Sequence, residues 1–442
     1  MKRLTVIAFL MIPIFNSVFG QQQHKKLLLT LEESIKIALE NNPDIIASKQ
    51  KIVQKQWEKE DSKTKFLPVI SGSFSYTRLD KSPSISVPGM PLEIEMSKNG
   101  IYSASINLTQ PVFTGGALSS QYLIKKVELD IAGGEKNLVE QDIVFQVIQT
   151  FFSVLKAANF YQAAEILVNQ RQAHLANVKK LFEAGLATKA DILKAEVTLA
   201  DAKQKLVETA NLMDLAKENL KTVLKLPFEI EISGQDCLAR IWPEKELSWW
   251  KEAAFKKRDE LKQIEKNRSI VELTKKIVQS ENYPDVFFIL SLKGEKGTSS
   301  GLNNWYQNIT ALVSFNMNIW NWQSTKKRIN AIDAQISQIE TQKTKISDLI
   351  SLEITSAYLN LKSAEEKIKV MEKAVEDAQE HVRVTELLRR EGLATTTDVI
   401  DAQTYLYQSK ASYYQALYDY QIAHYQLVKA SGQLLDEFRT EK

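Results

Sequence analysis

The chain has 442 residues, of which 44% are hydrophobic and 25% are charged, and this is the composition of an ordinary folded protein. The formal net charge is +3, and setting aside Lys2 and Arg3 leaves +1, so we expect no nucleic-acid partner. A single cysteine, Cys237, excludes an intrachain disulfide.

Residues 1–20 have the pattern of a secretory signal peptide: a positive start, an apolar run over 4–14 and a small-residue end at 17–20. The apolar run is too short for a transmembrane anchor, and no cysteine follows the expected cleavage site, so we expect export without N-terminal lipid. No later stretch approaches the roughly 20 uncharged apolar residues of a spanning helix. Any membrane crossing is therefore expected to use strands.

Residues 21–230 are predicted to form the first of two structural repeats. Short helices lead to strands at about 69–79 and 101–113, separated by a loop rich in Pro, Ser and Gly, and a helical hairpin follows over about 117–225 with its tip at 185–191. Both strands alternate apolar and small polar residues. This pattern is typical of a membrane β-barrel and also of a soluble sheet with one buried face, and these two strands alone favour the soluble sheet.

Residues 248–432 repeat the plan after a predicted equatorial connection at 228–247. We expect strands at about 286–293 and 305–319 around a loop at 294–301, then a hairpin over about 323–431 with its tip at 392–398. Residues 433–442 are charged and are predicted to be a loose tail. Aromatic residues at both ends of the last strand suit two membrane interfaces, with core aromatics as the alternative: Trp305, Tyr306, Trp320 and Trp322.

The two hairpins are copies of one unit. A shift of 207 residues places Gly185 on Gly392 and Asp191 on Asp398. Sustained steps of three and four apolar residues predict left-handed coiled coils about 100 Å long, with Arg171 interrupting the small-residue series. Four strands cannot close a barrel, and open strand edges are not tolerated in lipid, so membrane strands would make the protein an obligate oligomer.

Several motifs together resemble the TolC-like outer membrane efflux proteins. They are TLEESIKIALENNPDI at 30–45, Leu-Pro at 67–68, TQPVFTGG at 109–116 and the two tips at 185–195 and 392–402. The resemblance implies a mainly α fold with a membrane β-barrel portion, in which a homotrimer builds a 12-stranded barrel on a periplasmic α-barrel. It also implies a passive exit duct in the outer membrane that works with a periplasmic adaptor and an inner-membrane pump or exporter, without a cofactor.

The tip residues have a structural explanation. Gly185 and Gly392 stand where a helix end needs a left-handed residue, and the Thr-x-x-Asp pairs after them are capping-box starts. The resemblance adds that the tips contact the adaptor, through Gly185, Leu186, Thr188, Asp191, Gly392, Leu393 and Thr395.

Asp401 is not needed for capping, and Lys194 stands at its position in the first repeat. The resemblance implies that Asp398 and Asp401 form acidic rings at a gated constriction, whereas the alternative is two solvated carboxylates. The positions of the family's usual lock hold Ala394 and Arg389. A lock would need other residues, with Arg389 or Arg390 against Asp191 of a neighbouring hairpin as candidates.

Catalysis and metal binding have no support in the sequence. The four histidines are scattered and are predicted to lie on the surface: His24, His174, His381 and His424. Two alternatives to an efflux duct remain open, a duct for type I protein secretion and a structural coiled-coil spacer whose strands form a soluble cap. An enzyme is the third possibility.

Overall fold

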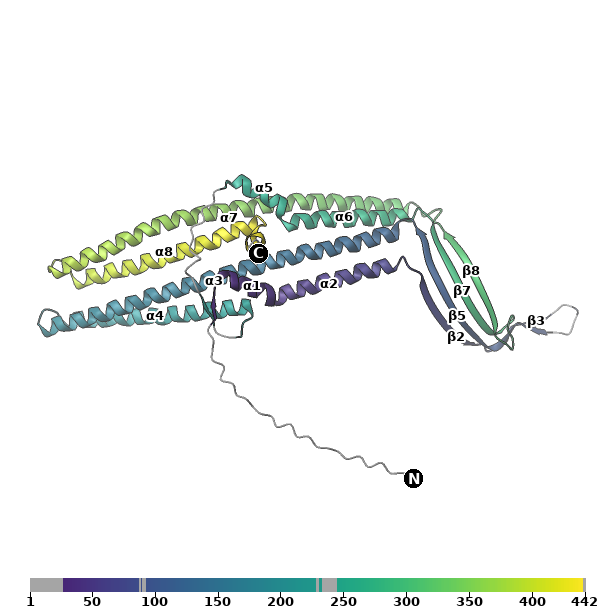
Figure 1. The fold of residues 1–442 in the computed structure, drawn as a ribbon, viewed down its shortest axis with the longest axis horizontal. Coiled ribbons are helices and arrows are strands. Elements are labelled where there is room, and N and C mark those ends of the chain that lie inside the picture. Colours follow the sequence, from purple (N-terminus) through teal and green to yellow (C-terminus); the bar gives the residue numbers. More distant parts are fainter. Residues whose placement is uncertain (1–26, 87–88, 90–92, 228–229, 233–244, 440–442) are drawn as a thin grey trace, which may run out of the picture.

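The computed structural model describes residues 27–86, 89, 93–227, 230–232 and 245–439. The predicted signal peptide and most of the predicted connection at 228–247 lie outside these residues. The described chain is elongated, with long helices side by side and a sheet at one end (Figure 1).

The first repeat runs from strand β1 (Leu27–Leu29) to helix α4. Its elements are α1 (Leu31–Asn41), α2 (Pro43–Thr64), β2 (Val69–Arg78), β3 (Ser84–Ser86), β4 (Glu93–Glu95), β5 (Ser97–Thr114), α3 (Ala117–Glu183) and α4 (Lys189–Leu224). The short hairpin β3–β4 lies within the segment predicted as a loop. Helix α3 is continuous through Gly133 and Gly134.

The second repeat follows β6 (Ile230–Ile232), which pairs in parallel with β1. Its elements are α5 (Leu247–Lys257), α6 (Asp259–Ser280), β7 (Asp285–Thr298), β8 (Tyr306–Asn316), α7 (Ser324–Arg390) and α8 (Thr396–Ala430). Strand β7 continues five residues into the segment predicted as the loop 294–301, because β5 extends equally far and supplies its hydrogen-bond partners.

The helices and strands keep one lateral order. Helices α2, α3, α6 and α7 are successive neighbours, and the sheet has the order β2–β5–β7–β8, antiparallel throughout (Figure 1). In the half of the molecule away from the sheet, α3 pairs with α4 and α7 pairs with α8 as two antiparallel hairpins. Each of the four strands therefore adjoins, in the chain, one of the four helices. Strands β2 and β8 are the two edges of the sheet.

The sheet has one apolar face and one face that is polar except near the helices, where Val69, Ile289 and Leu312 share a row with Thr109. The register aligns apolar side chains across all four strands, as in the row Ile70, Leu108, Leu290 and Ala311, while the next row is Ser71, Asn107, Ser291 and Thr310. On the polar face the hydroxyl groups of Ser73 and Ser105 lie 2.8 Å apart, and Ser291 donates to Asn107 Oδ1 at 2.6 Å. The apolar face is exposed on every strand. The soluble-sheet interpretation, which requires that face to be covered, is therefore wrong for the described chain.

The main hydrophobic core lies at the equator, where α1, α5 and the chain end cover the four long helices. Its largest fully buried side chains come from both repeats: Leu29, Ile35, Ile45, Ile148, Phe151, Phe152, Leu220, Leu224, Ile354, Leu361, Tyr420 and Leu427. Within the described residues, α3 is the one helix long and apolar enough to cross a membrane, and half of its apolar window is buried inside the protein.

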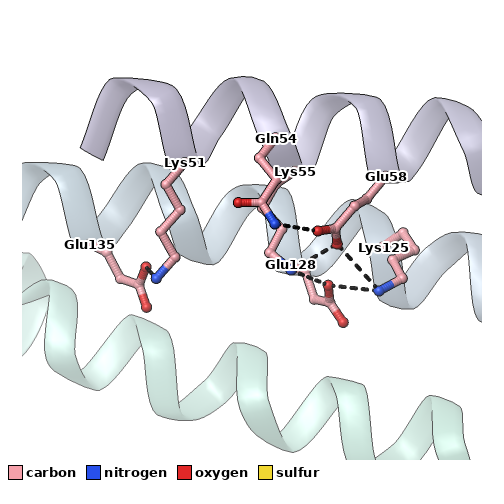
Figure 2. Close-up of polar contacts among 7 residues, drawn as sticks. All are labelled: Lys51, Gln54, Lys55, Glu58, Lys125, Glu128 and Glu135. Atoms are coloured by element: carbon pink, nitrogen blue, oxygen red, sulfur yellow. Dashed lines mark hydrogen bonds and ion pairs between the residues drawn. The ribbon is translucent and has the colours of Figure 1, made fainter. Parts of the chain in front are cut away.

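Helix α2 is held to α3 by charged side chains (Figure 2). Lys55 contacts Glu58 at 2.8 Å and Glu128 at 3.0 Å, and Lys125 reaches the same two carboxylates at 3.5 and 3.1 Å. The pKa of Lys55 is raised, chiefly by its hydrogen bond to Glu58 and then by the bond to Glu128. The face of α2 that carries Lys55 and Glu58 is therefore occupied by α3.

The tail predicted to be loose is a folded element, and this prediction was wrong for residues 434–439. They form α9 (Leu434–Arg439), with Leu434 fully buried and Phe438 stacked on Tyr425 at a centroid distance of 5.9 Å. Lys257 of α5 also pairs with Asp436 at 2.7 Å. Asp436 and Glu437 are exposed, while Leu434 and Leu435 complete the core.

Candidate functional site at the helical tips

Each tip is a self-contained turn. Gly185 and Gly392 have φ of 75° and 74°, the left-handed conformation that glycine adopts without strain. Leu186 N–H donates to Leu181 O and Leu393 N–H donates to Leu388 O, both at 2.8 Å, which closes the helix end in a Schellman arrangement. An added Cβ would meet no atom at either glycine, so backbone conformation alone selects it.

A capping box starts the second helix of each hairpin. Thr188 N–H donates to Asp191 Oδ2 at 2.8 Å while Asp191 N–H donates to the Thr188 hydroxyl at 3.2 Å. The pair Thr395 and Asp398 repeats this geometry at 2.6 and 3.2 Å. Hydrogen bonds from these threonines hold the pKa of both carboxyl groups below the usual range. Asp191 and Asp398 therefore act as ionised helix caps.

Two leucines project from the tips. Leu186 and Leu393 are each 76% exposed, although both are large apolar side chains. Nothing in the local turn requires this exposure, because the hydrogen bonds that close each turn are made by the backbone.

Asp401 lies on the exposed side of α8, one turn after the capping Asp398. Within the described chain it makes no hydrogen bond or ion pair, although its charge acts on Arg171 of α3. Lys194, at the equivalent position of the first repeat, donates to the Thr397 hydroxyl at 2.7 Å and so contacts the second hairpin. The two equivalent positions therefore make different contacts.

Arg171 is a residue whose role the sequence did not reveal. It is only 4% exposed and donates to Ile400 O at 3.0 Å, to the Thr404 hydroxyl at 2.8 Å and to Gln403 Oε1 at 3.3 Å. Burial lowers its pKa and the charge of Asp401 acts in the opposite direction. The guanidinium therefore joins the first hairpin to the start of α8, just above the second tip. The one sign of this role in the sequence was that Arg171 interrupts the series of small residues in the heptad pattern.

His174 lies one turn along α3 from Arg171, and the prediction of a surface histidine was wrong for it. It is 6% exposed, and its Nε2 has no hydrogen-bond partner in the described chain. Burial, followed by the charges of Arg389 and Arg171, lowers the pKa of His174 to about 4. His424 at the equator is also buried, contrary to the same prediction.

A polar cavity of about 560 Å³ opens between α3 and the second tip beside His174. Its lining includes Arg389, Arg390, Glu386 and Gln403. Within the described residues no carboxylate lies within 4 Å of either arginine, so the structure leaves both guanidinium groups free for another partner. In the same residues no group of three or more His, Cys, Asp and Glu side chains could hold a metal.

The four predicted interface aromatics lie at opposite ends of the sheet. Trp305 ends the β7–β8 turn and Tyr306 begins β8, far from the helices, and the Trp305 ring lies 6.5 Å from that of Tyr102. Trp320 and Trp322 follow β8 at the helical end and form an edge-to-face pair at 5.9 Å. All four are exposed.

Comparison with known proteins gives one consistent result. The family described as "Outer membrane efflux protein" matches residues 34–224 and 250–433. The alkaline protease secretion protein AprF of Pseudomonas aeruginosa is 21% identical over 347 residues, which cover 76% of this chain and 70% of AprF. Among solved structures, the channel CusC superposes with a TM-score of 0.76 at 14% identity, over 94% of this chain and 95% of its own. The outer membrane protein VceC of Vibrio cholerae superposes with a TM-score of 0.72 at 15% identity, over 91% and 96%.

Proposed function

Because the chain belongs to the outer membrane efflux protein family, we propose that three copies of it form a duct across the outer membrane, with the helices in the periplasm. The protein is a channel component rather than an enzyme. It is the outer-membrane exit of a tripartite efflux or secretion system, and the features below support its finer assignment.

The sheet carries this proposal. Its apolar face is uncovered, its opposite face is lined with hydroxyl and amide groups, and β2 and β8 are unpaired edges. Three copies supply 12 strands, and pairing β8 of each with β2 of the next leaves no edge open to lipid. A spacer with a soluble cap would instead present the apolar face to water, which is unfavourable. The aromatics Trp305, Tyr306, Trp320 and Trp322 suit the two membrane interfaces.

The tips support a contact with a periplasmic adaptor that is itself bound to an inner-membrane pump. Exposed Leu186 and Leu393 supply apolar area on rigid turns, and the turn residues Gly185 and Gly392 hold them there. Both bonds from Thr188 end on Asp191 Oδ2. Oδ1 therefore stays available for Arg389 or Arg390 of a neighbouring copy, as a lock would need.

Asp401 is the proposed gate residue. Three copies would place three unpaired carboxylates around one axis, which attracts cations at a constriction. Asp398 would add to this ring, although its capping bonds to Thr395 already account for its presence. The proposed passage is passive.

A duct for protein secretion is the second candidate. The relative AprF carries secretion of an alkaline protease in its name, which favours an exported protein as cargo over a small molecule. At 21% identity this supports a proposal about the cargo and nothing finer.

Conductance in planar lipid bilayers tests the proposed function. Purified protein should resist extraction by carbonate, insert from detergent and give discrete currents whose cation preference falls in Asp401→Asn. Protein that washes off membranes with carbonate, or that inserts without current in both the natural form and Asp401→Asn, would overturn it.

A further inference from the structure

The lateral order of the elements decides what meets at the boundary between two copies. Helix α2 with β2 and helix α7 with β8 are the outermost elements on opposite sides (Figure 1). If the proposed ring closes, β8 of one copy runs antiparallel beside β2 of the next. The segment from β8 to α7 then faces the junction of α2 and β2, since both lie where the helices meet the sheet. The inference below rests on this proposed trimer.

The segment between β8 and α7 has an unusual backbone. Trp322 and Gln323 have φ of 53° and 59°, whereas the equivalent residues 207 positions earlier are Gly115 and Gly116, at 59° and 88°. The left-handed conformation is unfavourable for any residue with a Cβ atom. A tryptophan keeps this conformation here although its side chain is 80% exposed and its one ring contact inside its own copy, within the described residues, is the edge-to-face contact with Trp320.

The neighbouring side chains extend this feature into a patch. Ile319 and Trp320 are exposed as well, and together with Trp322 they form an apolar projection that we name the junction cluster. An uncovered group of this size next to a free strand edge indicates a surface that a partner covers.

The opposite edge of the chain has a matching apolar groove. A cavity of about 830 Å³ lies at the end of α2, and its apolar lining is Trp57, Phe66, Leu67 and Tyr122. Phe66 and Tyr122 meet edge to face at 6.4 Å. Trp57 is 69% exposed, because the face of α2 that carries Lys55 and Glu58 is the one bound to α3 (Figure 2).

The charges beside the two surfaces are complementary. The groove lining near the C-terminus of α2 carries two carboxylates and one lysine, Glu60, Asp61 and Lys63, and is therefore net negative. Lys326 and Lys327 stand in the first turn of α7, which has no acidic residue. A helix C-terminus disfavours anions and an N-terminus disfavours cations, so each pair is unfavourable for its own helix. In the described chain Asp61, Lys326 and Lys327 make no ion pair, and they are free to attract one another across a boundary.

We infer that the junction cluster of one copy docks into the α2–β2 groove of the next copy, with Lys326 and Lys327 facing Glu60 and Asp61. Three such contacts would join the copies at the base of the barrel. Trp322 is thus assigned to the boundary between copies at the level of the membrane interface, which explains why the strained residue is a tryptophan and not a glycine.

Two substitutions separate the side chain from the backbone. Trp322→Gly introduces the residue that the first repeat has at the equivalent position, Gly115, so the single copy should fold at least as well. The trimer should dissociate at a protein concentration more than about tenfold higher than in the natural protein. Gln323→Gly relieves strain at the adjacent left-handed residue without removing the cluster, and it should leave trimer dissociation unchanged. Both are measured by mass photometry across a dilution series in detergent.

Cross-linking locates the contact directly. In a Cys237→Ser background, Ile319→Cys combined with Thr64→Cys should give disulfide-linked dimers and trimers on oxidation. Gln307→Cys with Thr64→Cys, which uses the far end of the same edge strand, should give none.

The outcomes distinguish this inference from the proposed function. A stable, conducting trimer in which Trp322→Gly has no effect, or in which both glycine variants weaken assembly equally, would overturn the docking and leave the duct intact. So would a trimer in which position 64 links to position 307 and not to 319. A protein that is monomeric and silent in bilayers would overturn both.

Discussion

Replacing Arg171 with methionine tests whether one buried guanidinium holds the two hairpins together near the tips. Methionine keeps much of the aliphatic volume but removes the charge and all three hydrogen bonds to Ile400 O, Gln403 and Thr404. The contact lies between α3 and α8, so its loss should act locally rather than on the whole fold.

The expected loss of free energy depends on which hydrogen bonds the partners of Arg171 retain after the substitution. Ile400 O still accepts from the Thr404 hydroxyl at 2.8 Å and is not left unpaired. The substitution also removes the cost of burying a charge that has no carboxylate in hydrogen-bond contact. We therefore expect a loss of about 1–3 kcal/mol from the contact between the hairpins, well below the sum of three charge-assisted bonds. This corresponds to a change of about 5- to 150-fold in local opening.

Amide hydrogen exchange of the full-length protein in detergent measures this opening. Exchange over residues 400–404 should accelerate by that factor in Arg171→Met, while residues 416–427 of the same helix keep their protection. Lys179→Met is the matched control, because Lys179 makes only an exposed pair with Glu196 at 3.5 Å on the same hairpin. Unchanged exchange at 400–404, or equal acceleration in the control, would refute the reasoning.

Three further outcomes are expected. The pKa of His174 is about 4 in the folded chain against 6.5 in the unfolded chain, so this group contributes its full stability above pH 6.5. As the pH falls from 6.5 through 4, up to about 3 kcal/mol of the free energy of unfolding is lost. Thermal unfolding of His174→Gln should lack this pH dependence. Asp398→Ala should cost about 1 kcal/mol of helix capping, because it removes the acceptor for both bonds from Thr395. Asp401→Ala should leave unfolding unchanged and alter the reversal potential in bilayers, and equal destabilisation by the two substitutions would contradict the division. Leu434→Ala should lower the free energy of unfolding by about 2–5 kcal/mol in denaturant titrations, a loss that a loose tail could not produce.

Local patterns in the sequence predicted those structural features that are set by residues close together in the chain. The glycine and Thr-x-x-Asp signals at each tip are satisfied within one turn, so the sequence predicts both their positions and their geometry. The alternation in the strands predicted two different faces, but it could not say whether the apolar face would be covered. That answer required the whole sheet.

The sequence did not predict features that depend on residues far apart in the chain. Arg171 and His174 resemble surface residues until α8 packs over them, because heptad position does not reveal which helix covers a polar side chain. The tail looked loose for the same reason, since Leu434 and Leu435 are two leucines among charges whose partners lie at the equator. The strain at Trp322 became visible only through its φ and its comparison with Gly115.

The pairing of β5 with β7 has a consequence for the order of folding. It joins residues almost 200 positions apart, such as Ser105 and Lys293, whereas each helical hairpin closes through a turn of a few residues. Local contacts form much faster than distant ones, so the hairpins should be helical while the strands are still unpaired. In the proposed trimer the last strand partner belongs to another copy. Assembly should therefore finish at the barrel in a concentration-dependent step, and until then a periplasmic chaperone would have the exposed strands to bind.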